Sequence, residues 1–421
     1  MKRLCLPLMI IGGMLLASPA LADPPIFTWQ LVGDQFSEAQ SVYAIDLDGD
    51  TDVDVVGASS GNNEIAWWEN DGNQDFTKHT VDSSFKQAQS VYAIDLDGDG
   101  DIDIVGAANG DNEIAWWEND ATQSFTKHTV DSSFRHVQSV YAIDIDGDGD
   151  VDIVGASKGD NEIAWWENGA TQSFTKHTVD SSFKQAQSVY AIDLDGDGDI
   201  DIVGAAKGDN EIAWWENEGA QNFTKHTVDS SFKHAQSVYA IDMDGDGDID
   251  ILGASEGDDE IAWWENDGSQ SFTKHAVDSS FKTAQSVYAT DLEPDGDVDI
   301  VAAAKKDNEI AWWENDGSQQ FAKYSIDSGF SDAESVYATD VNGDGDLDIL
   351  GASSGRNEIA LWENSGGGTT AIELVSFSAR PATVPSTFGE VTLEWHSPVV
   401  AGLCVLCGVV LCFRLQRSAA R

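Results

Sequence analysis

The phrase Ser-Val-Tyr-Ala returns seven times along this chain at a fixed step of 49 residues. It begins at Ser41, Ser90, Ser139, Ser188, Ser237, Ser286 and Ser335. A constant period of this length is the signature of a repeat architecture in which each copy forms one structural unit. The copies are nearly identical, since 90–119 and 188–217 differ only at Asn109 versus Lys207. Any fold for this chain must therefore place seven equivalent units side by side.

Each unit contains four strand-like runs. In the second unit they read SVYAIDLD, DIDIVGAA, NEIAWWEN and FTKHTVD. The runs are short, rich in β-branched and aromatic residues, and separated by Gly, Asn, Asp and Ser, which favour turns. Four strands in roughly 40–50 residues is the size of one β-propeller blade. The sequence therefore predicts an all-β fold, a seven-bladed propeller of four-stranded blades.

The two ends of the array predict how the propeller closes. The seventh unit stops after its third run, NEIALWEN, and continues into glycines. Before the first unit, residues 26–40 contain FTWQLV and GDQFSEAQ, which match the run that precedes every other unit. We therefore expect this N-terminal strand to complete the last blade and remove the open sheet edges. A competing donor, AIELVSF at 371–377, matches the repeat less well.

An acidic loop follows the first run of each unit. In the second unit it is DLDGDGDID (95–103), with aspartates at loop positions 1, 3, 5, 7 and 9 and glycines at 4 and 6. Calcium takes six to eight oxygen ligands, and glycine allows the positive φ angles of such a turn. An EF-hand is excluded because position 12 is Gly106 and both flanks predict strands. The alternative is a solvated acidic hairpin that serves only solubility.

These features resemble the FG-GAP/VCBS repeats that build the integrin-α-type seven-bladed propeller. The resemblance rests on the acidic loop between the first two strands, the following VGA, and the copy number, and it covers roughly residues 26–364. In that family the loops bind Ca²⁺ through the side chains at positions 1, 3, 5 and 9 and the backbone carbonyl at position 7. The resemblance thus implies up to seven Ca²⁺ ions.

The implied metal ligands follow from the loop positions. In blades one to four they are Asp46, Asp48, Asp50, Asp52, Asp54; Asp95, Asp97, Asp99, Asp101, Asp103; Asp144, Asp146, Asp148, Asp150, Asp152; and Asp193, Asp195, Asp197, Asp199, Asp201. In blades five to seven they are Asp242, Asp244, Asp246, Asp248, Asp250; Asp291, Glu293, Asp295, Asp297, Asp299; and Asp340, Asn342, Asp344, Asp346, Asp348.

Three loops depart from the pattern. Blade one has Thr51 at position 6, which should strain the turn but leave the carboxylates in place. Blade six has Glu293 at position 3 and Pro294 at position 4, so we expect it to be the weakest site. Blade seven has Asn342 at position 3, which supplies an oxygen without a charge.

The formal net charge of −53 limits the partners of this protein. A nucleic-acid or anionic-membrane binder needs a basic surface, so both classes are disfavoured and cations are favoured. Removing Lys2 and Arg3 with a leader gives −55, and seven Ca²⁺ ions would bring this only to −41. Cysteines occur at 5, 404, 407 and 412 alone, so no disulfide framework supports the repeats.

Both termini predict export. Residues 1–22 are predicted to form a signal peptide with a basic start, an apolar core and an Ala20-Leu21-Ala22 cleavage site, and an uncleaved anchor is the alternative.

The rest of the chain divides into several predicted segments. Residues 23–365 form the propeller and 366–370 a glycine-rich linker. Residues 371–397 resemble the start of a fibronectin-III-like domain. An apolar run (398–413) and a basic tail (414–421) predict a membrane anchor with the propeller outside, similar to a PEP-CTERM-type sorting anchor. A frame-shift remnant is the rival interpretation.

Other residues favour a binding protein over an enzyme. The Trp-Trp pairs lie mid-strand, which favours blade packing over sugar stacking. The recurring histidines (79, 128, 177, 226 and 275) have no second ligand nearby, so zinc is not expected. Repeated blades supply no asymmetric catalytic set. We therefore expect a secreted or cell-surface calcium-binding module, monomeric, that binds a glycan or surface protein. A purely structural module and a calcium-dependent polysaccharide-active enzyme are the alternatives.

Overall fold

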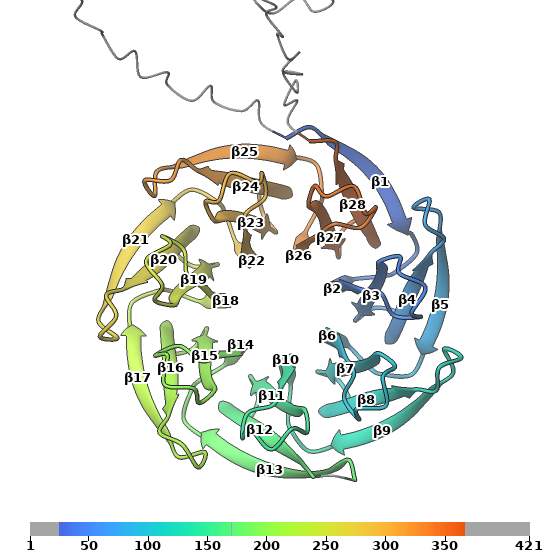
Figure 1. The fold of residues 1–421 in the computed structure, drawn as a ribbon, viewed down its shortest axis with the longest axis horizontal. Coiled ribbons are helices and arrows are strands. Elements are labelled where there is room, and N and C mark those ends of the chain that lie inside the picture. Colours follow the sequence, from blue (N-terminus) through green and yellow to red (C-terminus); the bar gives the residue numbers. More distant parts are fainter. Residues whose placement is uncertain (1–24, 170, 367–421) are drawn as a thin grey trace, which may run out of the picture. The chain divides into compact units, whose positions relative to one another are not determined.

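A computed structural model of the chain describes residues 25–169 and 171–366. In this part all 28 elements are strands, arranged as seven four-stranded antiparallel sheets around one axis (Figure 1). The prediction of an all-β seven-bladed propeller is thus confirmed. No helix in the described ranges is long and apolar enough to cross a membrane. The predicted leader, and the predicted anchor and basic tail, lie outside these ranges.

The strands of the first four blades run in chain order from the axis outwards. They are β2 (Ala39–Ile45), β3 (Asp54–Ser59), β4 (Glu64–Asn70), β5 (Phe76–Asp82); β6 (Ala88–Ile94), β7 (Asp103–Ala108), β8 (Glu113–Asn119), β9 (Phe125–Asp131); β10 (Val137–Ile143), β11 (Asp152–Ser157), β12 (Glu162–Gly169), β13 (Ser173–Asp180); and β14 (Ala186–Ile192), β15 (Asp201–Ala206), β16 (Glu211–Asn217), β17 (Phe223–Asp229).

The last three blades follow the same order, except that the outer strand of blade seven comes from the N-terminus. The strands are β18 (Ala235–Ile241), β19 (Asp250–Ser255), β20 (Glu260–Asn266), β21 (Phe272–Asp278); β22 (Ala284–Thr290), β23 (Asp299–Ala304), β24 (Glu309–Asn315), β25 (Phe321–Asp327); and β26 (Ala333–Thr339), β27 (Asp348–Ser353), β28 (Glu358–Asn364) with β1 (Phe27–Gly33). The inner strands begin two residues earlier than the sequence predicts, and a register shift separates Ala88 from Ser90.

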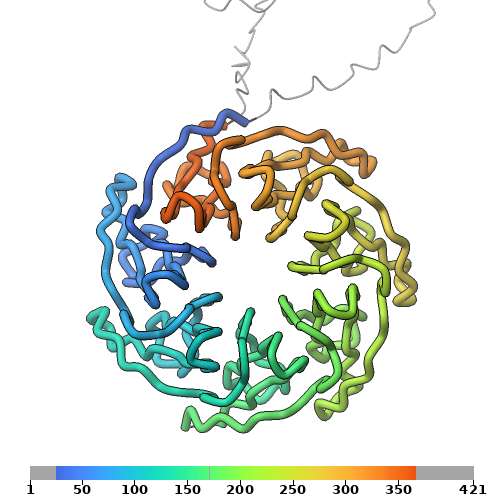
Figure 2. The backbone as a smooth tube through the Cα atoms, turned by 180° about the vertical axis from the view of Figure 1, so that it is seen from behind, coloured from blue at the N-terminus to red at the C-terminus, as the bar shows by residue number. Residues whose placement is uncertain are grey.

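The closing strand behaves as the sequence predicts. β1 pairs antiparallel with β28, so that Phe27 lies opposite Asn364 and Leu31 opposite Ala360. Figure 2 shows the blue start of the chain lying along the red end of the array. The outer place of blade seven is therefore filled by β1, and the competing segment 371–377 lies outside the described residues.

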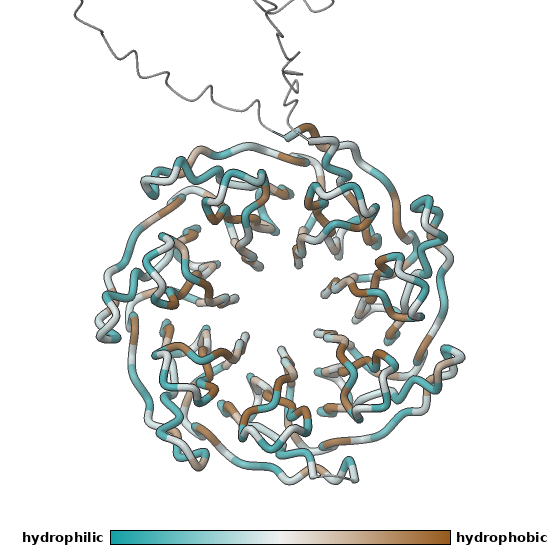
Figure 3. The backbone as a smooth tube through the Cα atoms, viewed as in Figure 1, coloured by the Kyte–Doolittle hydropathy of each residue, from teal (hydrophilic) through white to brown (hydrophobic). Residues whose placement is uncertain are grey.

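Apolar side chains fill the space between neighbouring blades. One cluster joins Leu47 and Trp67 of blade one to Val91 and Trp117 of blade two, and equivalent clusters fill the other junctions. Figure 3 shows apolar residues on the strands and polar residues in the loops. Each pair of tryptophans is buried at 1–2% exposure, because both faces of a blade are covered. This burial agrees with the expectation that the tryptophans are structural.

Seven tyrosines surround the axis, one from each inner strand. Neighbouring ring centroids lie 4.7–5.0 Å apart, which closes the circle from Tyr43 through Tyr337. Beside them, the Ser41 hydroxyl accepts a hydrogen bond from Val91 N of the next blade at 3.3 Å, and five further blade junctions repeat this contact. The constant Ser-Val-Tyr-Ala phrase therefore joins the blades at the centre.

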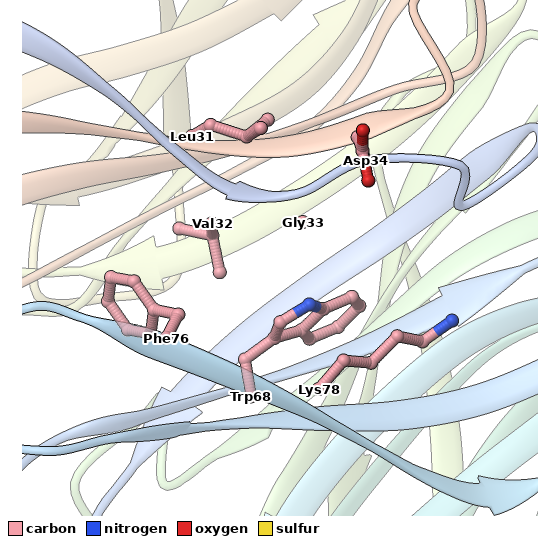
Figure 4. Close-up of a pocket in the computed structure, with 7 residues that line it drawn as sticks. All are labelled: Leu31, Val32, Gly33, Asp34, Trp68, Phe76 and Lys78. Carbon is pink, nitrogen blue, oxygen red and sulfur yellow. The ribbon is translucent and has the colours of Figure 1, made fainter.

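The seam between β1 and blade one differs from the other blade junctions. In most junctions an aspartate at the end of the outer strand lies near a lysine of the next blade, as Asp82 does 3.6 Å from Lys127. Gly33 stands in this place in β1, and a Cβ there would lie 2.3 Å from Nε1 of Trp68. A small pocket of about 200 Å³ lies here between β1 and blade one. Figure 4 shows the side chains that line it.

Candidate metal sites

The acidic loops all lie at one end of the blades, between each inner strand and its neighbour. In blade two the loop joins β6 to β7, and backbone N–H groups hold its carboxylates in place. Asp95 accepts from Gly98 N and Gly100 N at 2.8 and 3.1 Å. Asp97 accepts from Asp99 N at 3.1 Å, and Asp99 from Asp101 N at 2.9 Å. These bonds fix the turn and bring the side chains together.

The two loop glycines have the backbone conformation that the turn requires. Gly98 and Gly100 have φ values of 77° and 100°, which residues with a Cβ rarely adopt. In blade one Thr51 occupies the second of these places with φ 84°. A β-branched residue in this region is strained, yet Asp46, Asp48 and Asp50 still come together.

Five loops bring three carboxylates within metal-binding reach. In each set one oxygen per residue lies within 4.8 Å of the others, and the sets are Asp46, Asp48, Asp50; Asp95, Asp97, Asp99; Asp144, Asp146, Asp152; Asp193, Asp195, Asp197; and Asp242, Asp244, Asp246. Every donor is an oxygen, and no histidine or cysteine joins a set in the described ranges. Such a donor set fits a hard divalent cation such as Ca²⁺ and disfavours zinc.

The aspartate at loop position 9 differs from the other carboxylates. Asp103 is fully buried, and its two oxygens accept hydrogen bonds from Leu96 N at 3.0 Å and Asn119 N at 2.8 Å. Burial raises the pKa of Asp103 to about 7, although both hydrogen bonds oppose the shift. This residue therefore anchors the loop to the third strand. Of the seven aspartates at this loop position, only Asp152 joins a carboxylate set.

The aspartate at loop position 7 points away from the cluster in several blades. A Cβ built on Gly72 would lie 2.5 Å from Asp52, and Gly268 stands in the same relation to Asp248. These side chains therefore lie against the hairpin between the third and fourth strands. In these blades the position can contribute to a metal site only through its backbone carbonyl.

Blades six and seven contain no set of three carboxylates within the described residues. In blade six the Glu293 carboxyl lies beside buried Asp299, and its Oε2 is buried without a hydrogen-bond partner. Burial, together with the charge of that neighbour, raises the pKa of Glu293. A carboxyl whose pKa is raised is a poorer cation ligand, and the weakness of the blade-six site stays a prediction. In blade seven Asn342 accepts from Asp344 N at 2.9 Å and preserves the turn without a charge.

The recurring histidines form a different arrangement, which the sequence did not predict. His128 stacks on Trp116 with centroids 4.7 Å apart, and its Nε2 lies 2.7 Å from Oε2 of Glu118. Four further blades repeat the stack and the pair. A Trp-x-Glu phrase opposite a histidine on the next strand is the signal that could have predicted it. These pairs join the third strand of a blade to its outer strand.

The basic residues of the propeller avoid the acidic end. In the described ranges every lysine and arginine lies either on an outer strand or in the turns at the opposite end of the blades. Lys86, for example, pairs with Asp111 at 2.7 Å in those turns. The loops joining first to second and third to fourth strands contain none. The propeller thus has one strongly acidic face and one face of mixed charge.

Comparison with known proteins identifies the family. The model of the FG-GAP-like repeat matches six overlapping stretches, residues 46–106, 95–155, 144–204, 193–253, 242–302 and 291–351. These stretches span most of the chain and contain the acidic loops. The chain therefore belongs to the FG-GAP-like repeat family, as the loop spacing suggested. A comparison with curated proteins found no match.

Solved structures with the same architecture are distant in sequence. Virginiamycin B lyase from Staphylococcus aureus and a streptogramin B lyase each superpose with a TM-score of 0.58, at 10% and 12% identity. The WD40 β-propeller domain of Doa1 gives the same TM-score at 15% identity. Each alignment covers 80% of this chain and 97–99% of the other. At such identities the similarity supports the propeller fold and nothing further.

Proposed function

We propose that this protein is an exported, calcium-loaded propeller that binds or displays a partner at the cell surface and is not an enzyme. The observation that carries the proposal is the set of five preorganised carboxylate clusters on one face. Like charges this close repel strongly: a pair 4 Å apart costs about 4 kcal/mol at an effective dielectric of about 20. A bound cation in each loop would turn this repulsion into attraction.

The chemistry available to such an ion is structural. In a cluster such as Asp95, Asp97 and Asp99, three negatively charged oxygens would share one Ca²⁺, and Asp103 would continue to anchor the loop. The ion would link the inner strand to the second strand in each blade. Because the loops repeat around the ring, bound calcium would stiffen the whole face and present equivalent surfaces. A partner with repeated epitopes, such as a glycan, would then gain affinity through multivalency.

The test is thermal unfolding of the full chain with 1 mM CaCl₂ or with EDTA, together with counting of bound calcium by native mass spectrometry. We expect five to seven bound ions and a midpoint lowered by tens of degrees in EDTA. Magnesium serves as the matched control, because it dehydrates reluctantly and prefers strict octahedral sites. An unchanged midpoint with no bound ion would contradict the proposal.

The surface role needs its own test, because a purely structural module would also bind calcium. The calcium-loaded protein should retain a glycan or surface-protein ligand on an array and lose it when EDTA is added. Calcium binding without any retained ligand would favour the structural alternative. A polysaccharide-cleaving activity that depends on calcium would favour an enzyme instead.

A further inference from the structure

The seven blades differ from one another mainly on the mixed-charge face. The residue directly before each inner strand changes from blade to blade: Glu38, Gln87, His136, Gln185, His234, Thr283 and Asp332. The residue after each second strand also changes: Ser60, Asn109, Lys158, Lys207, Glu256, Lys305 and Ser354. By contrast, the Ser-Val-Tyr-Ala phrase beside them is constant. Surface turns tolerate substitution and commonly carry binding residues, so their contacts decide whether these positions form a site.

These variable residues contact one another around the axis. Nδ1 of His136 lies 2.7 Å from Oδ1 of Asn109 in the preceding blade. Lys207 pairs with Glu256 of the following blade. The contacts place the variable positions in one ring on the mixed-charge face.

One part of this ring contains a cavity. Where blades six, seven and one meet, a space of about 390 Å³ is lined by Glu38, Gln40, Lys305, Asp332, Glu334 and Ser354. All six side chains are polar, and no aromatic ring is among them. The cavity depends on closure of the propeller, because it joins residues that are some 300 positions apart in the sequence.

Glu334 is the residue that distinguishes this cavity. The six other blades have glutamine in its place: Gln40, Gln89, Gln138, Gln187, Gln236 and Gln285. The Glu334 side chain is only 8% exposed. Its Oε1 accepts hydrogen bonds from Lys305 Nζ and, at 2.6 Å, from Ser354 Oγ. Among the described residues, its Oε2 has no hydrogen-bond donor.

The charges of the lining indicate what the cavity would hold. Three carboxylates, those of Glu38, Asp332 and Glu334, face one ammonium group, that of Lys305. Lys305 offsets one negative charge and leaves two. A primary ammonium group carries three N–H donors and no acceptor, and so matches three carboxylates, two from the segment that begins β26 and one, Glu38, from the segment before β2. A sugar would find no aromatic platform here.

We propose that this cavity binds a primary ammonium group, either of a free alkylamine or of a lysine side chain on a partner. The proposal rests on the proposed binding function and adds its ligand class and location. The cavity lies on the face opposite the acidic loops and none of its lining residues belongs to them, so binding in the cavity does not require a calcium ion as a ligand.

The test measures binding of Nα-acetyl-lysine amide to the full chain by isothermal titration calorimetry. The buffer contains 1 mM CaCl₂ and 150 mM NaCl, which occupy the acidic loops and screen long-range attraction. Nα-acetyl-norleucine amide, which has the same backbone without the ammonium group, is the negative control. We expect saturable binding of about one equivalent of the lysine probe and none of the norleucine probe.

Two variants locate the site. Glu334→Gln restores the residue present in the other blades, and we expect it to weaken binding at least about tenfold. Glu256→Gln removes the same charge from the same face outside the cavity, and we expect less than about a twofold change. Unfolding midpoints of both variants verify that they fold. Asp332→Gln, which copies blades two and four, is a second test at the cavity.

Each outcome is decisive. Equal weakening by Glu334→Gln and Glu256→Gln would show diffuse attraction to an acidic protein and overturn the proposal, as would absent binding by the folded protein. Calcium counted in the same sample reports separately on the proposed function, so the two can fail independently. If n-butylammonium binds as well as the lysine probe, a free amine suffices. Clearly tighter binding of the lysine probe identifies a protein side chain.

Discussion

Aspartates with the same spacing in the sequence have different roles in the folded loop. Asp95, Asp97 and Asp99 are partly or fully exposed and converge, whereas Asp103 is buried and accepts from the backbone N–H groups of Leu96 in the loop and Asn119 at the end of β8. The difference arises because position 9 is the first residue of β7. A carboxylate there is held between the loop and the third strand by backbone N–H groups.

This difference gives a test at single residues. Asp99→Asn removes one charge from the blade-two cluster, and we expect about tenfold weaker binding of one calcium ion, equivalent to about 1.4 kcal/mol. Asp101→Asn is the matched control, because position 7 is expected to offer only its backbone carbonyl. Calcium titration followed by native mass spectrometry measures both. Equal losses in the two variants would contradict the assignment of side chains to the cluster.

The buried aspartates also predict how calcium-free stability depends on pH. Burial raises the pKa of Asp54, Asp103, Asp152, Asp201, Asp250 and Asp348 to about 7, above the usual 3.8. Between these values the folded state binds more protons than the unfolded state, so stability falls as pH rises toward 7. We expect the EDTA-treated protein to lose about 5 °C or more of midpoint between pH 5.5 and 7.5.

Calcium should remove this dependence, because a nearby cation favours the ionised carboxylates. Differential scanning calorimetry in EDTA and in 1 mM CaCl₂ measures both curves. A calcium-free midpoint that rises with pH over this range would show that the buried aspartates are not the controlling groups.

At the scale of the element, β1 closes the ring and differs from the other outer strands. All six of those strands carry a lysine where β1 has Trp29 and end in an aspartate where β1 has Gly33. The backbone of Gly33 approaches the indole of Trp68 too closely for any side chain. The strand can therefore seal blade seven only because this glycine lets it lie against blade one.

Gly33→Ala should accordingly destabilise the closing junction. The added methyl group would overlap the Trp68 indole, and displacement of a packed ring costs about 1–3 kcal/mol. Gly169→Ala is the matched control, since a Cβ there meets only Ser173 O at 3.6 Å. Urea unfolding of both variants in calcium measures the difference, and similar midpoints would show that β1 can shift without cost.

At the scale of the whole molecule, repulsion between negative charges opposes closure of the propeller ring. The seven blades bring their acidic loops to one face, and repulsion among them acts against the ring. Outer lysines offset part of this effect, as Lys127 does by lying 3.6 Å from Asp82 of blade one and 4.6 Å from the centre of the Phe85 ring, which precedes blade two. These contacts join blades but leave the loop face uncompensated.

Salt should therefore stabilise the calcium-free protein more than the loaded one. Raising NaCl from 20 to 500 mM shortens the screening length from roughly 20 Å to roughly 4 Å. We expect the midpoint in EDTA to rise by several degrees, about the effect of 1 kcal/mol, and the midpoint in calcium to change little. Potassium chloride at the same ionic strength is the control for ion-specific effects. An equal rise of the unfolding midpoint with and without calcium would show that the screened repulsion is not between the acidic loops.

The sequence by itself determined the period, the four strands of each blade, the number of blades and the closing role of β1. These properties follow from local alternation, turn residues and exact repetition, which can be read without knowing any long-range contact. It also predicted the acidic loops and the departures of blades one, six and seven, because the oxygen donors lie within nine residues of each other.

Only the tertiary structure decided which groups share a site. The anchoring role of Asp103 depends on Asn119, and each histidine–glutamate pair depends on the register of two strands. The cavity around Glu334 exists because closure of the ring brings Glu38 beside blade seven. Burial, pKa shifts and cavities arise from contacts between segments far apart in the chain. The sequence of a single repeat therefore does not predict them.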